Sequence, residues 1–357
     1  MNDDALRTAL SRLGGDPAIR AEMIRTCQKF EQLPEHLFTT VRDDITGPIV
    51  DALHENVERV RKELSSGIVF EFHYRSKIAR DFVMSIPEKP DHVWEPQTTK
   101  LLLRLSERAR HVLIGGAYFG DQAVLIADRL RNRGSVHAFE PNTDQAAMLE
   151  HNARLNGLEN IRVNRVGLWS DDSSRLRLVG PDALASSVAA SDGEEGPTFP
   201  TTTIDSYLRS SEIERLDLIM LDLEGAELAA LQGARSQLSQ PAGTAPHLVF
   251  EVHRSYVDWS DGLHNTGILR YLASLGYTMF AVRDFQSNYD LGDGPIELVP
   301  AATAYLEGPP HGFNVLAIKD AALVQNDGFL IRPHVSPKLL LHRDPALHHP
   351  AGGLRPR

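Results

Sequence analysis

A regular alternation of apolar and helical segments between His111 and Asp320 constrains the fold of this chain more than any other feature. Short apolar runs bounded by turn residues are typical of buried strands, whereas the longer segments between them have helical spacing. Strands that are separated by helices pair in parallel, and the helices then cover both faces of the sheet. The strands are expected at His111–Ile114, Ser135–Phe139, Ile161–Val166, Asp217–Leu221, His247–Val252, Tyr277–Val282 and Asn314–Ile318.

A separate N-terminal region, residues 1–90, is predicted to precede this α/β sheet. Residues 1 to about 65 show helical patterns of apolar residues. The alternation within Ile68–Tyr74 is typical of a strand, and Ile78–Ser85 is the expected second strand of a hairpin. This helical and hairpin region either caps a site or pairs two copies of the chain in a homodimer, and the sequence leaves both open.

Two further boundaries follow from composition. The segment Pro87–Pro90 breaks regular structure and marks the start of the main domain, which is assigned to residues 91–320. Beyond Asp320 the pattern fades into proline and histidine, so residues 321–357 are expected to form a C-terminal tail.

The charge balance excludes several classes of partner. The chain has 48 acidic and 37 basic residues and a formal charge of −11, which argues against broad binding of nucleic acid or of anionic membranes. It contains no run of apolar residues long enough to span a bilayer. The first residues, Met1–Asp4, lack the apolar core of a signal peptide, and Cys27 is the single cysteine. We therefore expect a cytoplasmic protein that acts on a small molecule.

A glycine-rich turn, Gly115–Gly120, follows the first expected strand. Glycines there let the backbone approach a cofactor closely at the start of a helix. Glu140 ends the second strand, where a carboxylate can accept hydrogen bonds from both hydroxyls of a ribose. Together the two features indicate an adenosine-containing cofactor and leave S-adenosylmethionine (SAM) and NAD open.

The segment Leu221–Glu227 separates these two cofactors. It closes the fourth strand with three carboxylates and a glycine, a pattern that an NAD-dependent oxidoreductase does not explain. The glycine turn also lacks the G-x-G-x-x-G spacing that dinucleotide binding favours. The oxidoreductase remains the main enzyme alternative at this point.

Several motifs occur in an order that resembles a known family. They are Val112–Gly120, Ala138–Asn142, Asn152–Gly157, Thr202–Asp205 and Leu221–Glu227. Together, over roughly residues 94–320, they resemble the FkbM-type SAM-dependent methyltransferases. The resemblance implies a class I methyltransferase (Rossmann-like) fold with a seven-stranded sheet whose last strand is antiparallel. It also implies methyl transfer, usually to a hydroxyl of a sugar or a secondary metabolite.

The resemblance also implies a set of cofactor-binding residues. The methionine and ribose portions are assigned to Gly116, Ala117, Tyr118, Phe119, Gly120 and Asp121. The ribose is assigned to Glu140, Pro141 and Asn142, and the adenine to Gly167, Leu168 and Trp169. An N-terminal segment that the family often folds over the cofactor contributes Trp94, Gln97 and Thr98.

One position departs from the family pattern. Such enzymes commonly have an acidic residue just before the glycine turn, where this chain has Ile114 and Gly115. The departure puts one contact to the methionine amino group in doubt. We hypothesise that Asp121 or Asp222 replaces the missing carboxylate.

The catalytic candidates lie at the carboxyl ends of the fourth and fifth strands, where open α/β sheets bind ligands. Asp222 follows the fourth strand, and Glu251 and His253 end the fifth. Period-two alternation predicts that Glu251 and His253 share one side of their strand. Our preferred hypothesis makes His253 the general base, helped by Asp222 or Glu251, because an imidazole pKa of about 6.5 suits proton transfer near neutral pH.

Other hypotheses remain beside this one. Asp222, Glu251 and His253 are also an acceptable ligand set for a divalent cation such as Mg²⁺, although the family motif demands no metal. The methyl acceptor could be a carboxyl group rather than a hydroxyl. A different class of protein, one that binds SAM without catalysis, is left open by the departure at Ile114.

Overall fold

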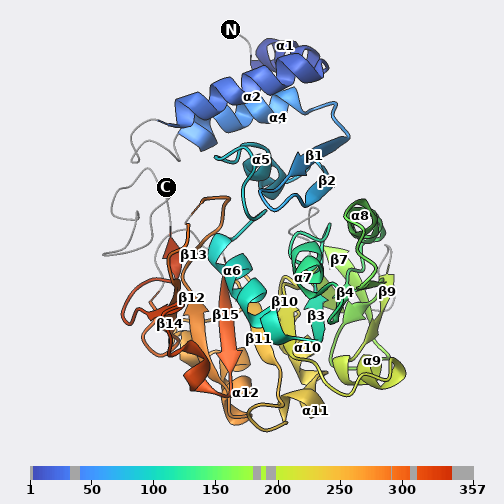
Figure 1. Ribbon diagram of the computed structural model, residues 1–357, viewed down its shortest axis with the longest axis vertical. Helices are drawn as coiled ribbons and strands as arrows, with labels where there is room; N and C mark the ends of the chain where they lie inside the picture. Colours follow the sequence, from blue (N-terminus) through green and yellow to red (C-terminus); the bar gives the residue numbers. More distant parts are fainter. Residues whose placement is uncertain are drawn as a thin grey trace. The chain divides into compact units, whose positions relative to one another are not determined.

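The computed structural model describes residues 3–32, 41–179, 186–189, 198–290, 292–305 and 312–339 (Figure 1). These residues fall into two compact units. The first contains the described residues up to Pro96, the stretch between Phe285 and Gly292, and Leu339. The second contains Gln97–Asp284 and Asp293–Lys338.

The N-terminal unit combines helices with one two-stranded sheet. Its elements are α1 (Asp3–Gly14), α2 (Pro17–Glu31), the π-helical turn η2 (Arg42–Thr46), α4 (Gly47–Leu53), β1 (Arg59–Glu63), β2 (Val69–His73) and α5 (Lys77–Val83). Asp16 caps α2 by accepting hydrogen bonds from the backbone N–H groups of Ala18 and Ile19.

The hairpin of this unit differs from the prediction. β2 pairs antiparallel with β1, which lies in a segment predicted to be helical. The expected partner strand, Ile78–Ser85, is wrong, because α5 occupies most of that segment. Ser76 caps this helix by accepting a hydrogen bond from the N–H of Ala79. The buried residues of α5 include Ala79, Phe82 and Val83, and this helical spacing outweighed the strand-like composition.

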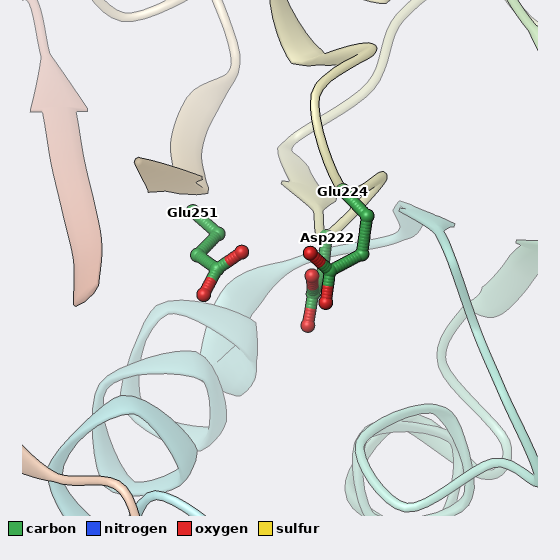
Figure 2. Close-up of side chains that lie close together, drawn as sticks. All are labelled: Asp222, Glu224 and Glu251. Carbon is green, nitrogen blue, oxygen red and sulfur yellow. The ribbon is translucent and has the colours of Figure 1, made fainter. Parts of the chain in front are cut away.

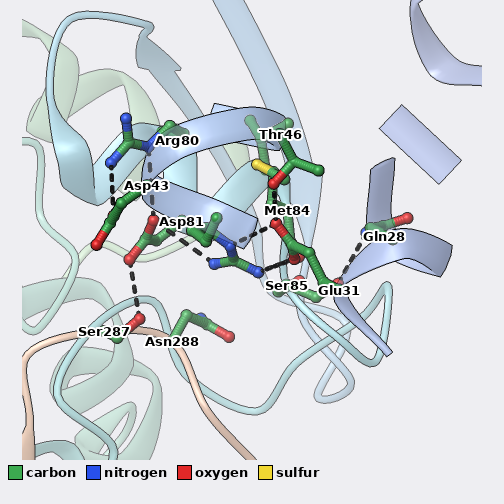
Figure 3. A network of polar contacts seen from close by, with 12 residues as sticks. Gln28, Glu31, Asp43, Thr46, Arg80, Asp81, Met84, Ser85, Ser287 and Asn288 are labelled. Atoms are coloured by element: carbon green, nitrogen blue, oxygen red, sulfur yellow. Dashed lines mark hydrogen bonds and ion pairs between the residues drawn. The ribbon is translucent and has the colours of Figure 1, made fainter. Parts of the chain in front are cut away.

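A buried polar network holds the N-terminal unit together (Figure 3). The guanidinium of Arg42 donates two hydrogen bonds to the carboxylate of Glu31, and its Nη1 lies 3.5 Å from Oδ1 of Asp81. Thr46 donates to Glu31 over 2.5 Å, and Ser287 donates to Asp81 over 2.8 Å. Since buried charges are costly unless they are paired and hydrogen-bonded, this network requires all of its members.

Residues from far along the chain belong to this same unit. Asn288 donates hydrogen bonds of 2.8 Å to the backbone oxygens of both His92 and Val93. The N–H of Glu95 donates to the carbonyl of Ser287. The stretch between Phe285 and Gly292 is thus a component of the N-terminal unit, although the sequence on both sides of it belongs to the other unit.

The second unit is organised around one large sheet. Its strands are β3 (His111–Gly115), β4 (Ser135–Phe139), β5 (Ile161–Asn164), β10 (Leu218–Leu221), β11 (His247–Val252), β12 (Thr278–Val282), β14 (Ile296–Pro300), β15 (Phe313–Ile318) and β16 (Phe329–Ile331). Among the described residues the strand order is β16-β14-β12-β15-β11-β10-β3-β4-β5. The five strands from β5 to β11 are parallel, and β15 runs antiparallel to β11 and β12.

The predicted fold class is confirmed and extended. Seven of these strands, from β5 to β12, reproduce the predicted sheet with its antiparallel member β15. Two more strands add to the edge, because β14 pairs antiparallel with β12 and parallel with β16. β16 lies after residue 320, in the part of the sequence for which we predicted a tail.

Helices cover both faces of this sheet (Figure 1). They are α6 (Pro96–Leu105), η3 (Ser106–Arg108), α7 (Ala123–Leu130), α8 (Thr143–Leu155), α9 (Ile204–Ser210), α10 (Glu227–Gln232), α11 (Arg235–Leu238), η5 (Leu263–Asn265), α12 (Gly267–Ser274) and η6 (Ala321–Val324). Leu113, Ile219 and Phe250 pack in one apolar core with residues of α9 to α12. The alternating residues, such as Val112 and Ile114, are also buried, as expected for strands covered on both sides.

Smaller sheets complete the unit. β6 (Gly167–Leu168), β7 (Arg175–Val179), β8 (Ser186–Ala189) and β9 (Thr198–Thr202) form a sheet of order β6-β9-β7-β8. The short strands β13 (Asp284–Phe285) and β17 (Lys338–Leu339) pair with each other. Within the described part of the chain, no helix is long and apolar enough to cross a membrane.

Candidate active site

The glycine turn after β3 packs directly on two neighbouring strand ends. The N–H groups of Gly116 and Ala117 donate to the carbonyl of Phe139, the last residue of β4, over 3.0 and 3.1 Å. Gly116 has a φ of +74°, and a Cβ at this position would stand 1.7 Å from the carbonyl oxygen of Asp222. A side chain therefore cannot be accommodated at residue 116, and the turn depends on glycine there.

Glu140 is fixed beside this turn by backbone amides. Its carboxylate accepts a hydrogen bond of 2.9 Å from the N–H of Tyr118 and one of 2.8 Å from the N–H of Asn142. Asn142 in turn caps α8 by accepting from the N–H groups of Asp144 and Gln145. The chain from β4 to α8, through Pro141, thus holds one carboxylate at a set position next to the turn.

The turn is also supported from α8. The side-chain amide of Asn152 donates a 2.9 Å hydrogen bond to the carbonyl of Phe119, and both side chains are buried. Sequence reasoning placed Asn152 within a family motif but gave it no role. Asp121 follows the turn, and burial together with the negative charge of Asp222 raises the pKa of its carboxyl group to about 7.

The residues assigned to adenine lie in β6 and just after it. Gly167 and Leu168 are buried and pair with Thr201 and Thr202 of β9. Leu168 belongs to the apolar core, and the N–H of Trp169 donates to the carbonyl of Thr202. The backbone of this segment is therefore held by the small sheet.

Gln97 and Thr98 anchor the start of α6. Their N–H groups donate to the two carboxylate oxygens of Asp284 over 3.0 and 2.7 Å. The side chain of Gln97 accepts from the N–H of Glu297, and Asn314 donates to the hydroxyl of Thr98. Both side chains are buried and bonded within the second unit, whereas Trp94 belongs to the N-terminal unit.

Three carboxylates gather at the ends of β10 and β11. Asp222 and Glu224 follow β10, and Glu251 lies within β11. One carboxylate oxygen from each lies within 4.8 Å of the others, and Figure 2 shows the three side chains facing a common space. The sequence predicted Asp222 and Glu251 here but assigned no role to Glu224. The chain turns back after Asp222, with a φ of +50° at Glu224 and +109° at Gly225, and so brings Glu224 to the other two.

The pKa values of Asp222 and Glu224 in this cluster, and of the neighbouring Glu227, are raised. Burial raises the pKa of Asp222, and burial with the neighbouring charges of Asp222 and Glu227 raises the pKa of Glu224. A hydrogen bond with Tyr256 opposes the rise at Glu224. Glu227 is buried, and its pKa is raised to about 7 by burial although it accepts hydrogen bonds from the N–H groups of Leu223 and Gly225.

Glu251 is held between two other strands. It stands opposite Asn314 of the antiparallel strand β15, and a Cβ on Gly312 would lie 2.0 Å from its Oε1. The charge of Glu251 also raises the pKa of Lys338, but burial outweighs this effect and lowers that pKa to about 8. Because Gly312 has no side chain, the carboxylate of Glu251 has room beside it.

His253 lies outside the carboxylate cluster. Its Nδ1 accepts a hydrogen bond of 3.0 Å from the N–H of Ser255 in the turn that follows β11. A neutral imidazole has one acceptor nitrogen, so this bond places the ring proton on Nε2. Burial and the charge of Lys338 lower the pKa of His253. The ring is 5.3 Å from that of Tyr256.

This arrangement supports two kinds of chemistry. A carboxylate with a raised pKa can accept a proton from a hydroxyl near neutral pH. Carboxylate oxygens at the separations found for Asp222, Glu224 and Glu251 can also hold a divalent cation. The glycine turn and Glu140 can hold the ribose of an adenosine cofactor.

The strand order, the antiparallel strand β15 and the glycine turn at the end of β3 define a class I methyltransferase fold. Residues 115–279 match the sequence profile of the family described as the methyltransferase FkbM domain. The chain carries an FkbM methyltransferase domain, as its motifs predicted. No curated protein matches the sequence.

Solved structures show similarity at low sequence identity. The methyltransferase FkbM of Methylobacillus flagellatus KT is 14% identical with a TM-score of 0.37, and the match covers 85% of this chain and 60% of that one. An O-methyltransferase of Bacillus cereus in complex with SAH is 16% identical with a TM-score of 0.35, covering 63% and 81%. The O-methyltransferase TomG of Streptomyces achromogenes, in complex with SAM, is 11% identical with a TM-score of 0.37, covering 69% and 92%.

Proposed function

We propose that this chain uses SAM to methylate a hydroxyl group of a small molecule, such as a sugar or a secondary metabolite. The observation that carries the proposal is the position of the carboxylate cluster, Asp222, Glu224 and Glu251, at strand ends next to the glycine turn. Gly116 lies close to the backbone carbonyl of Asp222, so the cofactor-binding turn adjoins the strand end that bears this carboxylate.

Backbone groups and one carboxylate would hold the cofactor. Glu140, fixed by the amides of Tyr118 and Asn142, presents its carboxylate where ribose hydroxyls can donate to it. The turn Gly116–Gly120 offers close backbone approach. SAM supplies an electrophilic methyl group on a cationic sulfonium, and the negative charge of Asp222 at the neighbouring strand end favours a cationic ligand.

We propose Asp222 as the general base, with Glu251 and Glu224 positioning the acceptor hydroxyl. Proton acceptance requires a vacant lone pair, and the Nδ1 of His253 is already engaged by Ser255. Asp222 is partly exposed, and its raised pKa brings it nearer to the working pH, where a general base is most effective. His253 then acts by packing against Tyr256, whose hydroxyl bonds to Glu224.

The same cluster argues against a carboxylate as the group that accepts the methyl. A negatively charged acceptor would meet three acidic side chains, and like charges brought together are repelled. A neutral hydroxyl meets no such repulsion and finds groups that accept its proton. A divalent cation bound by the three carboxylates would be an alternative means of activating a hydroxyl.

The proposal is tested by methyl transfer from SAM labelled in its methyl group to a panel of hydroxylated sugars and aromatic alcohols. Asp222→Asn is expected to lower kcat by about 10²–10⁴-fold, the usual contribution of a general base. Asp261→Asn, which removes an exposed carboxylate elsewhere in the same unit, is the matched control and should retain full activity.

Four outcomes of this assay are informative. Transfer that survives exhaustive chelation excludes the cation, and transfer lost on chelation and restored by Mg²⁺ supports it. An Asp222→Asn variant with full activity contradicts the assignment of the base. A folded protein that binds SAM but methylates no acceptor of the panel would favour a SAM-binding protein without catalysis.

We also propose a homodimer formed through the N-terminal region of a cytoplasmic enzyme. Large apolar side chains are exposed on its first two helices, namely Leu6, Leu13, Ile19 and Phe30. Exposed apolar groups gathered on one region favour association. Light scattering should give twice the chain mass, and the double variant Leu13→Glu/Phe30→Glu should give the monomer. An unchanged mass in the variant would contradict this interface.

A further inference from the structure

The N-terminal unit contains a pocket of its own, built from the described residues of its central segments. Its volume is about 670 Å³, within the range of pockets that hold small molecules. The walls come from the turn between α4 and β1 and from the turn between β2 and α5. The methyl-transfer proposal assigns none of these residues.

Several polar groups of the pocket are already paired. The hydroxyl of Tyr74 donates to Oδ1 of Asp51 over 2.6 Å, and Arg80 donates to Oδ2 of the same carboxylate over 3.1 Å. Glu55 forms an ion pair with Arg7. These bonds fix part of the wall of the pocket. Because Asp51, Arg80 and Glu55 are paired with other side chains, their charges are partly neutralised and less available to a ligand.

Two cations of the pocket have no such partner. Arg75 and Lys77 are exposed, and neither forms an ion pair or a side-chain hydrogen bond with any part of the chain that the structure describes. They stand on either side of Ser76, with Arg75 in the turn after β2 and Lys77 as the first residue of α5. Their positive charges are therefore both available to one ligand group, which favours an anion.

The turn between α4 and β1 offers acceptors. His54 is buried, and its Nδ1 lies 2.8 Å from the carbonyl of Val50, to which it donates. The Nε2 of the neutral ring is then an acceptor, and burial lowers the pKa of His54, which keeps it neutral. The ring stacks on Tyr74 with centroids 4.1 Å apart, so its orientation is fixed. Glu58, on the same wall, is a second acceptor.

We propose that this pocket binds an anionic small molecule that also carries hydroxyl groups, with the anionic group on Arg75 and Lys77 and the hydroxyls directed to His54 and Glu58. Cations from one segment of the lining and acceptors from the other match the two kinds of group on such a ligand. A neutral polyol satisfies only the acceptors, and a simple inorganic anion satisfies only the cations. This site is independent of the proposed methyl transfer, since binding can be measured without turnover.

The test is calorimetric titration of the full-length protein with three probes that share one carbon skeleton: glucose 6-phosphate, gluconate and glucose. Glucose 6-phosphate should bind, and glucose should bind at least about tenfold more weakly, the size expected for loss of one charge-assisted interaction. Gluconate distinguishes the two anionic groups: equal binding indicates a site for anions in general, and weak binding a site for phosphate.

Matched double variants show whether the pocket is responsible. Arg75→Gln/Lys77→Gln should weaken glucose 6-phosphate by about tenfold or more. Lys29→Gln/Arg61→Gln removes the same charges from exposed positions of the same unit outside the pocket and should leave the affinity unchanged. Both variants change exposed side chains, and circular dichroism confirms that they fold.

Two results would overturn the proposal. One is binding of glucose as tight as that of glucose 6-phosphate, which removes the role of the anionic group. The other is the absence of binding by both anionic probes, or anionic binding that the two double variants weaken equally. Neither result bears on SAM binding, which is measured separately.

Discussion

The carboxyl ends of the parallel strands in the methyltransferase unit form one edge of the sheet. The two halves of this edge, at β3 and β4 and at β10 and β11, place carboxylates in opposite environments. Next to β3 and β4, the carboxylate of Glu140 accepts hydrogen bonds from the backbone N–H groups of Tyr118 and Asn142. Next to β10 and β11, three carboxylates, Asp222, Glu224 and Glu251, lie against one another. The first environment stabilises a fixed negative charge, whereas the second penalises it.

We propose that this difference separates cofactor binding from proton transfer. Hydrogen bonds from N–H groups favour an ionised carboxylate, which is suited to hold a ligand in one orientation. Burial beside like charges raises the pKa and lets a carboxylate exchange a proton near neutral pH. A carboxylate can therefore hold the cofactor at the ends of β3 and β4 and act as a base at the ends of β10 and β11.

The largest effect is expected where the two halves touch. Gly116→Ala would place a Cβ 1.7 Å from the carbonyl oxygen of Asp222, at a φ of +74°. The clash and the strained backbone should destabilise the unit by more than about 4 kcal/mol or abolish folding. Thermal denaturation measures this. Gly157→Ala also replaces a glycine of positive φ but meets no atom within 4 Å, so it should cost only about 1 kcal/mol. Equal melting temperatures for the two variants would show that the close approach is unimportant.

A smaller effect is expected within the carboxylate cluster. Glu224→Gln replaces a titratable carboxyl group with an uncharged amide and should lower kcat by about 10- to 100-fold, the value of one charge-assisted hydrogen bond. SAM binding should be little changed, because Glu224 belongs to the second half of the edge. Glu214→Gln is an exposed control in the same unit. If Glu224→Gln instead loses SAM binding and keeps kcat, the two halves are not separate in function.

The raised pKa values predict a pH dependence of stability. The pKa of Glu227 is about 7 in the folded state, against an ordinary value of 4.5. Between these values the folded state binds more protons than the unfolded state, so the free energy of unfolding falls as pH rises from about 5 to 8. Glu227→Gln, which keeps an acceptor oxygen, should melt with a smaller decrease over this range. A variant whose melting temperature falls as steeply as that of the native chain would contradict burial as the cause.

The smallest effect is expected at His253. Because its Nδ1 is occupied by the N–H of Ser255, His253→Ala should change kcat by less than about threefold between pH 6 and 9. Steady-state rates across that pH range are the measurement. A loss of about 100-fold together with the loss of one limb of the pH profile would restore His253 as the general base.

Much of the fold could be read from the sequence because its central strands are buried on both faces. Ser135–Phe139 and His247–Val252 are mostly apolar, and the structure has β4 and β11 at these bounds. The strands outside this central part of the sheet were not predicted. β14 and β16 depend on distant partners, and β1 is a polar strand whose pairing with β2 no local pattern reveals.

The candidate site was predictable to the extent that it follows from the strands. Parallel strands end at one edge, so Asp222 and Glu251 were expected to approach each other. Glu224 was not, because its place depends on two positive φ angles after β10. The alternation expected to align His253 with Glu251 ends with β11 at Val252, and the turn directs the histidine to Ser255.

The central claim, that the glycine turn and Glu140 form a SAM site, is tested most directly by calorimetric titration of S-adenosylhomocysteine into the full-length protein and its Glu140→Ala variant. We expect micromolar binding by the native chain and a loss of about tenfold or more in the variant, since a charged hydrogen-bond acceptor is removed. The control Glu159→Ala changes an exposed carboxylate of the same unit and should bind normally. No binding by the folded native chain, or equal binding by the native chain and Glu140→Ala, would contradict the account.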